Sequence, residues 1–334
     1  MRAAVFREVG RPLSLEEVPM PKKENEREVI LRVLATGLCH GDVHLVTGQW
    51  EGDIIVETPR ILGHEIAGEV TEGANGLKRG QKVLVYSSIG CGNCKYCKAG
   101  HYQFCERVRV IGYHYDGGFA EYVKVPDPKY LLPVEGDPLE LAPLADAGVT
   151  AYNATKGIGS GDDVLVIGTG AVALYSIQIL KHAGANVTVV GRNLAKLEVA
   201  SKLGSDEVIH AKARNYVQKV SEKSRRRRFD YVLDFVGADY SLKDALWLLR
   251  NEGELRVVGE FGGYMNYPEQ LLVLRGLKIR GVLYGTLDDM EKVYDLYKSG
   301  KLKTLPVPFK LEEINVAINE AYEGRIVGRA VIVP

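Results

Sequence analysis

The segment Val164-Leu-Val-Ile-Gly168-Thr-Gly170-Ala-Val-Ala173 decides the fold of the second half of this 334-residue chain. Its apolar run, its glycines and its helix-compatible end predict a strand, a tight turn and a helix. Gly168 allows the turn, and Gly170 lets the backbone approach a pyrophosphate at the helix N-terminus. The residues expected to bind a dinucleotide are Gly168, Thr169, Gly170, Ala171 and Val172. The alternative is a plain strand–turn–helix unit of another α/β fold.

Strand-like and helix-like segments alternate beyond this turn. The alternation predicts an α/β fold with a doubly wound, six-stranded parallel sheet of the Rossmann type, formed by residues 147–285. The expected strands are Val164–Ile167, Val187–Val190, Val208–His210, Tyr231–Phe235, Leu255–Val258 and Lys278–Leu283. Helices are expected at Ala171–Ala183, Leu194–Leu203, Ser241–Leu249, Leu287–Lys298 and Leu311–Glu323, and a last strand at Ala330–Val333.

The first part of the chain has a β-rich pattern instead. Short apolar runs are separated there by glycine, proline and charged residues, which is typical of short strands. The expected strands are Val29–Leu34, Ile66–Val70, Lys82–Tyr86 and Phe119–Val125. Residues 1–146 and 286–334 are therefore predicted to form a second, β-rich domain.

The end of the second Rossmann strand indicates the coenzyme. NAD binders carry an Asp or Glu there, which holds the ribose 2′-hydroxyl. This chain has Gly191-Arg192-Asn193 and no carboxylate. Gly191 leaves room and Arg192 offers a cation for a 2′-phosphate, so we expect these three residues to bind NADP(H) rather than NAD(H). In the alternative, Arg192 is a solvated residue at a helix start and either coenzyme binds.

Composition excludes several classes of partner. The 43 basic residues equal the 43 acidic ones, so net charge predicts no nucleic-acid or anionic-membrane partner. The run Arg225–Arg228 precedes an expected strand, on the rim opposite the ligand edge, and is predicted to be a solvated loop. No apolar run approaches the roughly 20 residues of a membrane span, and no signal peptide is evident, so we expect a cytoplasmic protein. Few Gln, Met and Cys beside many Lys, Arg and Glu hint at a thermophile.

Four of the five cysteines lie within one short window: Cys91, Cys94, Cys97 and Cys105. This spacing lets one loop close around a tetrahedral ion, and four thiolates leave no open position on Zn²⁺. We therefore expect a structural zinc. Two disulfides are the alternative, although three cysteines this close together are awkward to pair locally.

The fifth cysteine, Cys39, is followed by His40, Asp42 and His44, and later by His64 and Glu65. A thiolate and a neutral imidazole suit an open zinc site, which needs a third ligand. At this point the chain resembles the zinc-containing alcohol dehydrogenases of the medium-chain dehydrogenase/reductase family. The resemblance spans essentially the whole chain and rests on Gly37-Leu-Cys39-His40, Gly63-His64-Glu65, the four cysteines, Asp116-Gly-Gly-Phe-Ala-Glu-Tyr122, Gly168-Thr-Gly170 and Gly328-Arg329-Ala-Val-Ile-Val-Pro334.

The resemblance implies that the β-rich domain is a GroES-like catalytic domain. The family's third zinc ligand, usually Cys and sometimes Asp, falls on Asp146, which could otherwise be the N-cap of the next helix. Glu65 resembles a residue that reaches the metal transiently. Asp42 is expected to hydrogen-bond the far nitrogen of His64, or else to form a turn. Arg329 resembles the arginine near the coenzyme pyrophosphate, or forms a surface ion pair.

Two departures from the family stand out. Gly41 replaces the usual Ser or Thr, whose hydroxyl passes the alcohol proton outward toward a histidine, here His44. Either a water fills that gap, or alcohol oxidation is slow, or the physiological reaction differs. The stretch Tyr86-Ser87-Ser88-Ile89 contains small side chains where members of the family often carry bulky residues that line the substrate channel. It suggests room for a bulky or cyclic substrate, or simply a turn capped by serines.

The resemblance implies hydride transfer between a nicotinamide coenzyme, which Arg192 indicates to be NADP(H), and a small-molecule alcohol or carbonyl substrate that could be bulky or cyclic. It implies two zinc ions per chain: one structural, and one catalytic on Cys39, His64 and Asp146. An NADP(H) reductase of activated alkenes or quinones that needs no zinc, and a zinc-stabilised nucleotide-binding sensor with little catalysis, are the alternatives. Family members pair the last Rossmann strand, here Lys278–Leu283, across a two-fold axis. A homodimer or homotetramer is therefore expected.

Overall fold

The computed structural model describes the chain except residues 51–54, 74–75, 213–214, 225–227 and 244. Three arginines of the basic run 225–228 thus lie outside the described residues. The chain divides into two compact units. The first comprises Met1–Val149, Tyr284–Tyr297 and Lys303–Pro334, and the second comprises Thr150–Leu283 and Lys298–Leu302.

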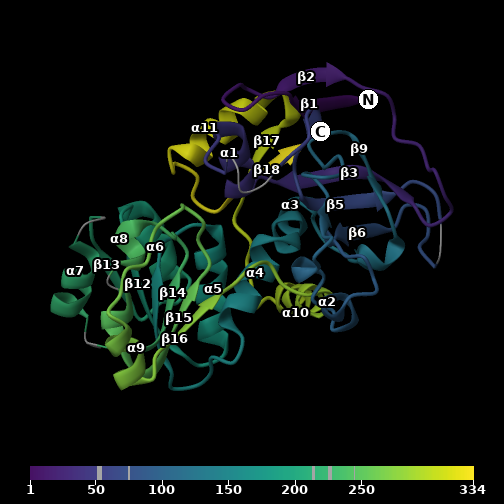
Figure 1. Cartoon of the computed structure of the whole chain (residues 1–334). Coiled ribbons are helices and arrows are strands. Elements are labelled where there is room, and N and C mark those ends of the chain that lie inside the picture. The colour runs from purple at the N-terminus through teal and green to yellow at the C-terminus, as the bar shows by residue number, and fades with distance from the viewer. Residues whose placement is uncertain (51–54, 74–75, 213–214, 225–227, 244) are drawn as a thin grey trace. The chain divides into compact units, whose positions relative to one another are not determined.

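The second unit contains a six-stranded parallel sheet (Figure 1) in the order β13-β12-β11-β14-β15-β16. Its strands are β11 (Asp163–Ile167), β12 (Asn186–Gly191), β13 (Glu207–His210), β14 (Phe229–Asp234), β15 (Leu249–Val257) and β16 (Lys278–Gly281). Read along the chain, this is the order 3-2-1-4-5-6 of the Rossmann sheet, which confirms the predicted fold class. All of β11 is buried, as its unbroken apolar run requires.

The helices of this region are α4 (Ala147–Thr155), α5 (Ala171–His182), α6 (Leu194–Lys202), α7 (Tyr216–Lys223), α8 (Asp239–Leu242) and α9 (Glu269–Arg275). The single helix predicted over Ser241–Leu249 is wrong. Helix α8 ends at Leu242, a 3-10 turn follows at Ala245–Leu248, and Leu249 opens β15 by pairing with Phe229. Periodicity alone does not separate a buried helix from a strand in so short an apolar run.

The first unit is built on a seven-stranded sheet in the order β10-β6-β5-β3-β18-β17, with β9 beside β3. Its strands are β3 (Val29–Gly37), β5 (Glu65–Val70), β6 (Lys82–Val85), β9 (Tyr122–Val125), β10 (Leu131–Pro133), β17 (Pro306–Lys310) and β18 (Arg329–Val333). The sequence did not predict β17, because Pro306 and Pro308 interrupt it. Prolines are tolerated there because β17 is an edge strand.

Smaller elements complete the first unit. They are a three-stranded sheet of β1 (Arg2–Phe6), β2 (Ser14–Glu17) and β4 (Arg60–Ile61), the pair β7 (Ser88–Ile89) and β8 (Arg109–Val110), and the helices α1 (His40–Thr47), α2 (Lys95–Lys98), α3 (Pro138–Leu141), α10 (Leu287–Lys298) and α11 (Ile314–Tyr322). Helix α10 has its predicted bounds, whereas the helix predicted from Leu311 begins as a 3-10 turn, Leu311–Glu313. Among the described residues, no helix is long and apolar enough to cross a bilayer.

Strand register brings distant candidate residues to one end of the large sheet. Gly37, the last residue of β3, pairs with Glu65, the first residue of β5. Gly37 also pairs with Val331 of β18, so Arg329 starts its strand near the same point. The chain then turns at Cys39 into α1. The ends of three strands and the start of one helix therefore converge, although they are far apart in sequence.

Candidate functional site

The four clustered cysteines have the geometry of a tetrahedral zinc site. The Sγ atoms of Cys91 and Cys97 are 4.0 Å apart, and those of Cys94 and Cys105 are 3.8 Å apart. Zinc–sulfur bonds of roughly 2.3 Å give a tetrahedron with edges of about 3.8 Å. A disulfide would need about 2.05 Å, and all five cysteines are free. The structure therefore excludes the disulfide alternative and fits a four-thiolate zinc.

Backbone amides of the same loop stabilise these sulfurs as thiolates. The backbone N–H of Cys91 donates to Cys105 Sγ at 3.3 Å, and that of Cys97 donates to Cys94 Sγ at 3.5 Å. Backbone hydrogen bonds from Asn93 and Cys94 lower the pKa of Cys91 to about 6, whereas burial raises the pKa of Cys97. Because zinc binds the thiolate form, the lowered pKa favours metal binding.

Cys39, His64, Glu65 and Asp146 form a second potential metal site. One ligand atom from each lies within 4.8 Å of the others. Cys39 caps α1, His64 and Glu65 lie at the start of β5, and Asp146 follows the 3-10 turn Ala142–Ala145. His64 Nε2 is 3.6 Å from Asp146 Oδ2. A thiolate, an imidazole and a carboxylate form a donor set that Zn²⁺ accepts, so the structure brings the predicted ligands together.

Asp42 holds the ligand segments through their backbone. Its carboxylate is fully buried; it accepts hydrogen bonds from the backbone N–H of Cys39 at 3.0 Å and from that of Gly63 at 3.3 Å. His64 Nδ1 lies 3.5 Å from Asp42 Oδ1 and has no hydrogen-bond partner among the described residues. The predicted pair of His64 and Asp42 is therefore in contact, but at a distance longer than an ordinary hydrogen bond. The carboxylate is turned toward the two amides, which fix the turns on either side of the site.

Arg329 pairs with the two carboxylates of this set, Glu65 and Asp146. Its guanidinium is buried, donates twice to Glu65, with Nε 2.9 Å from Oε2, and lies 3.2 Å from Asp146 Oδ2. Burial raises the pKa of Glu65, and Arg329 opposes that rise. Burial also works to raise the pKa of Asp146, but His64 and Arg329 outweigh it and hold that pKa well below its usual value. Arg329 is thus a buried partner of the ligand set, and its contact with a coenzyme stays a prediction.

Gly41 has a neighbour that the sequence did not reveal. A Cβ atom at position 41 would lie 2.5 Å from Tyr113 Oη and 3.0 Å from the Trp50 ring. Tyr113 is 8% exposed and packs its ring edge-on against His64, with 5.2 Å between the ring centroids. Burial raises the pKa of Tyr113 well above 10, so the hydroxyl keeps its proton at neutral pH. The space of the missing side chain is therefore filled by protein.

His44 is buried behind Trp50. The ring centroids of His44 and Trp50 are 5.3 Å apart. The Trp50 ring also contacts the Tyr113 ring, with 6.4 Å between the centroids. His44 Nδ1 is hydrogen-bonded to the Gln49 side chain, and burial lowers the pKa of His44. A role for His44 at the outer end of a proton path stays a prediction.

The two small residues Ser87 and Ser88 are buried beside another tyrosine. The backbone N–H of Ser87 donates to Tyr284 Oη at 3.3 Å, and Tyr284 Oη donates to the carbonyl of Ala145 at 2.6 Å. Tyr284 therefore lies against the backbone of this segment. A bulky or cyclic substrate stays a prediction.

The glycine turn of the second unit has the shape that a pyrophosphate needs. Gly168 has φ of +110°, which favours glycine, and Gly170 is the N-cap of α5 without a side-chain cap. A Cβ at Gly170 would meet nothing within 4 Å, so a ligand can approach the backbone there. The open amides at the start of the helix, Ala171 and Val172 among them, suit a negatively charged diphosphate.

Basic groups gather at the carboxyl end of β12. Arg192 is exposed and lies over the Tyr240 ring at 5.8 Å, while its carbonyl is 3.1 Å from His210 Nε2. Burial and the nearby charge of Arg192 lower the pKa of Lys196. A side chain at Gly191 would approach the Thr169 methyl group at 2.9 Å. Positive charge thus stands where an NAD-binding sheet carries a carboxylate.

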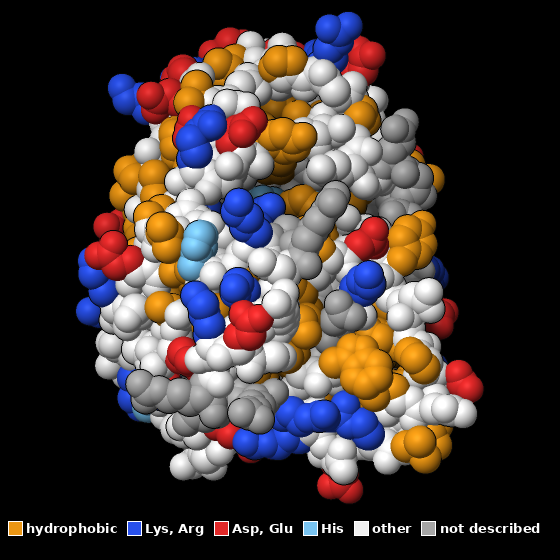
Figure 2. Space-filling model, turned by 90° about the vertical axis from the view of Figure 1, so that its left-hand side faces the viewer, with side chains coloured by type: hydrophobic (Ala, Val, Ile, Leu, Met, Phe, Trp, Pro, Cys, Tyr) orange, Lys and Arg blue, Asp and Glu red, His pale blue; other side chains and the backbone are white. Residues whose placement is uncertain are grey.

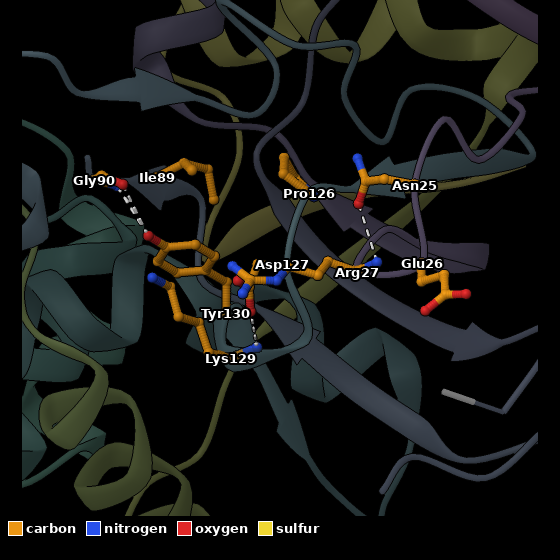
Figure 3. Close-up of a pocket in the computed structure, with 9 residues that line it drawn as sticks. All are labelled: Asn25, Glu26, Arg27, Ile89, Gly90, Pro126, Asp127, Lys129 and Tyr130. Carbon is orange, nitrogen blue, oxygen red and sulfur yellow. Dashed lines mark hydrogen bonds between the residues drawn. The ribbon is translucent and has the colours of Figure 1, made fainter. Parts of the chain in front are cut away.

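One further depression of about 630 Å³ lies on the first unit (Figure 3). Its lining residues are Asn25, Glu26, Arg27, Ile89, Gly90, Pro126, Asp127, Lys129 and Tyr130. The figure shows the Tyr130 hydroxyl bonded to Gly90 at its edge. It shares no residue with either ligand set, so it does not define the reaction.

Comparisons with known proteins agree with this geometry. Residues 25–136 match the alcohol dehydrogenase GroES-like domain, and residues 171–299 match the zinc-binding dehydrogenase family. An NAD-dependent alcohol dehydrogenase of Sulfurisphaera tokodaii is 35% identical, with both chains fully covered. A D-arabinose 1-dehydrogenase (NADP(+)) of Saccharolobus solfataricus is 33% identical over 100% of this chain and 97% of its own. The crystal structure of the alcohol dehydrogenase from Aeropyrum pernix superposes with a TM-score of 0.93 at 33% identity, with both chains fully covered.

Proposed function

Because the chain belongs to the zinc-containing alcohol dehydrogenases of the medium-chain dehydrogenase/reductase family, we propose that it interconverts an alcohol and a ketone or aldehyde with NADP(H). The buried set of Cys39, His64 and Asp146 carries this proposal, since it joins three ligands suited to zinc. A zinc ion held there would supply Lewis acidity toward the substrate oxygen. The nicotinamide would supply the hydride chemistry.

The residues around the set keep these ligands in a form that can bind metal. Asp42 fixes the backbone on either side of the site through two amide hydrogen bonds. Arg329 keeps Glu65 engaged and helps hold Asp146 as a carboxylate. Glu65 lies close enough to act as an occasional further ligand if it leaves Arg329.

The partner we propose is a small molecule. On the face shown in Figure 2, Lys and Arg side chains occur together with Asp and Glu, and hydrophobic side chains lie between them. A protein that binds nucleic acid would be expected to carry a basic footprint and a basic overall charge, whereas this chain has a formal net charge of zero.

The coenzyme proposal rests on Arg192. A relative described as NAD-dependent and a relative described as using NADP(+) are about equally similar to this chain. The choice between the two coenzymes therefore depends on the chain's own residues. Arg192, with Lys196 and His210 nearby, gives the end of β12 a positive character. We therefore favour NADP(H), because a 2′-phosphate would be held by a charged hydrogen bond.

Replacing Arg192 by glutamine tests this preference. We expect KM for NADP⁺ to rise about 10- to 100-fold, which corresponds to losing one hydrogen bond between charged groups. KM for NAD⁺ should change little, because NAD⁺ lacks the phosphate. Lys202→Gln is the matched control: Lys202 is an exposed residue at the end of α6, the helix that follows Arg192, and pairs with Glu198. This change should leave both constants unchanged. Wild-type enzyme that prefers NAD⁺ would contradict the proposal.

The edge of the Rossmann sheet supports a homo-oligomer. Strand β16 is the last strand of the sheet, and Ile279 on it is 39% exposed. The preceding helix α9 exposes Val273 at 75% and Leu274 at 80%. An open edge flanked by apolar side chains is an aggregation risk unless another copy covers it. We propose that a second copy pairs with β16.

A charge on this surface should separate the subunits. We expect the double variant Leu274→Lys/Ile279→Lys to weaken dimerisation at least about tenfold, because a buried lysine without a partner is costly. Sedimentation velocity over a concentration series gives the measurement. Val316→Lys, which charges an exposed valine on α11, is the control and should leave the mass unchanged. A monomeric wild type would refute the proposed pairing.

A further inference from the structure

The observation behind this inference is the pairing of Gly41 with Tyr113. Gly41 lies in the first turn of α1, two residues after Cys39, and its N–H donates to Cys39 Sγ at 3.4 Å. A Cβ at that position would come within 2.5 Å of Tyr113 Oη. Real Cβ atoms essentially never lie so close to another heavy atom. The phenol oxygen therefore already occupies the place where a side chain at position 41 would begin.

Tyr113 is 8% exposed, and its hydroxyl oxygen is not one of the fully buried polar atoms that lack a partner. A phenol hydroxyl can both donate and accept a hydrogen bond. The Tyr113 ring lies against His64, with ring centroids 5.2 Å apart, and His64 is one of the proposed ligands. A polar substrate atom beside His64 and position 41 would therefore lie within reach of this hydroxyl.

We infer that Tyr113 is a catalytic residue whose hydroxyl contacts the substrate oxygen. It takes the place of the Ser or Thr hydroxyl that Gly41 does not provide for proton transfer. This inference rests on the proposed dehydrogenase function. In alcohol oxidation, the substrate O–H proton passes to Tyr113 Oη as the phenol releases its own proton to water. Bound NADP⁺ would accept the carbinol hydrogen as hydride, so that an alcohol and NADP⁺ would give a carbonyl compound, NADPH and one proton. The phenol ends the step as it began, neutral.

Trp50 keeps the phenol in this position. Its ring contacts both the place of the missing Gly41 side chain and the Tyr113 ring. It also packs against His44. Because an indole ring does not carry protons, it separates Tyr113 from His44, and the proton leaves Tyr113 through water.

The test moves the hydroxyl between the two positions. Tyr113→Phe removes one oxygen and keeps the ring. Gly41→Ser adds a hydroxyl at the usual place but forces a Cβ against Tyr113 Oη. The double variant Gly41→Ser/Tyr113→Phe places the serine where the phenol oxygen was removed. Each protein is measured as zinc-loaded holoenzyme for alcohol oxidation, for binding of isobutyramide (an unreactive carbonyl compound) in the presence of NADPH, and for its unfolding midpoint.

We expect Tyr113→Phe to lower kcat about 100-fold, the usual contribution of a positioned proton-transfer group. The same variant should weaken the binding of isobutyramide about tenfold, as expected for one lost hydrogen bond. Its zinc content and its affinity for NADPH should stay constant. Gly41→Ser alone should lower the unfolding midpoint, because it overpacks the site. The double variant should recover that midpoint and regain at least tenfold in kcat over Tyr113→Phe. Such non-additivity is the signature of two groups sharing one place.

Two failures can be told apart. If the wild type oxidises alcohols and binds isobutyramide, and Tyr113→Phe equals it in both, only the role of Tyr113 is overturned. If the wild type does neither, the proposed function fails and the role of Tyr113 fails with it. If Gly41→Ser alone raises alcohol oxidation without loss of stability, position 41 has room after all and the inference is wrong.

Discussion

Asp146→Asn is expected to lower kcat/KM for alcohol oxidation by about 1,000-fold or more, since a metal's charge stabilisation contributes several kcal/mol to the transition state. Asparagine keeps the shape of the side chain but removes the anionic ligand. Asp146 lies 3.6 Å from His64 and 3.2 Å from Arg329, so its loss also leaves Arg329 with one fewer partner. Steady-state kinetics with zinc analysis provides the measurement.

The matched variant is Asp146→Cys, which replaces one anionic zinc ligand with another. It should retain the second zinc and much of the activity, because the ligand set remains a cysteine-rich set that zinc accepts. Both variants should keep wild-type affinity for NADPH, because Asp146 is not one of the proposed coenzyme-binding residues. Asp146→Asn with undiminished activity and zinc would show that Asp146 is not a ligand.

Cys94→Ser is expected to destabilise the first unit severely. Cys94 both lies among the four sulfurs and caps α2, and structural zinc sites contribute folding energy directly. A loss of about 5 kcal/mol would lower the unfolding midpoint by roughly 10 °C or more for a unit of this size. Thermal unfolding with and without a chelator checks the effect.

Asn93→Ala provides the control in the same loop. The Asn93 side chain contacts Cys91 Sγ and Arg107 but offers no ligand to the cluster. Its loss should cost no more than about 1 kcal/mol, as for a typical surface hydrogen bond. If the chelator leaves the wild-type midpoint unchanged, the cluster does not stabilise the fold through a metal.

The Rossmann order and the four-cysteine set could be predicted because their signals are local, whereas Asp146 was assigned to the second set only through the family resemblance. Buried parallel strands have continuous apolar runs, and metal ligands have recognisable chemistry and spacing. Strand β17 was missed because its prolines argue against a strand unless its edge position is known. The helix expected at Ser241–Leu249 failed because Leu249 has a strand partner, Phe229, that no local pattern reveals.

The details of the site depend on contacts that only the folded chain makes. Asp42 was expected to orient His64; it lies 3.5 Å from His64 Nδ1, and its oxygens also accept hydrogen bonds from two backbone amides that the sequence did not indicate. Gly41 looked like a gap, yet Tyr113 fills it from a distant segment of the chain. The sequence showed that position 41 lacks a side chain. Only the folded structure shows that Tyr113 lies beside this position.

Zinc content per chain tests the central claim most directly. We expect two zinc ions in the wild type and one in Cys39→Ser, because that variant keeps the four-cysteine cluster and loses a ligand of the second set. One zinc ion in both proteins would show that the second set does not bind zinc. It would leave a reductase that needs no zinc, or a zinc-stabilised nucleotide-binding sensor, as the remaining interpretation of this chain.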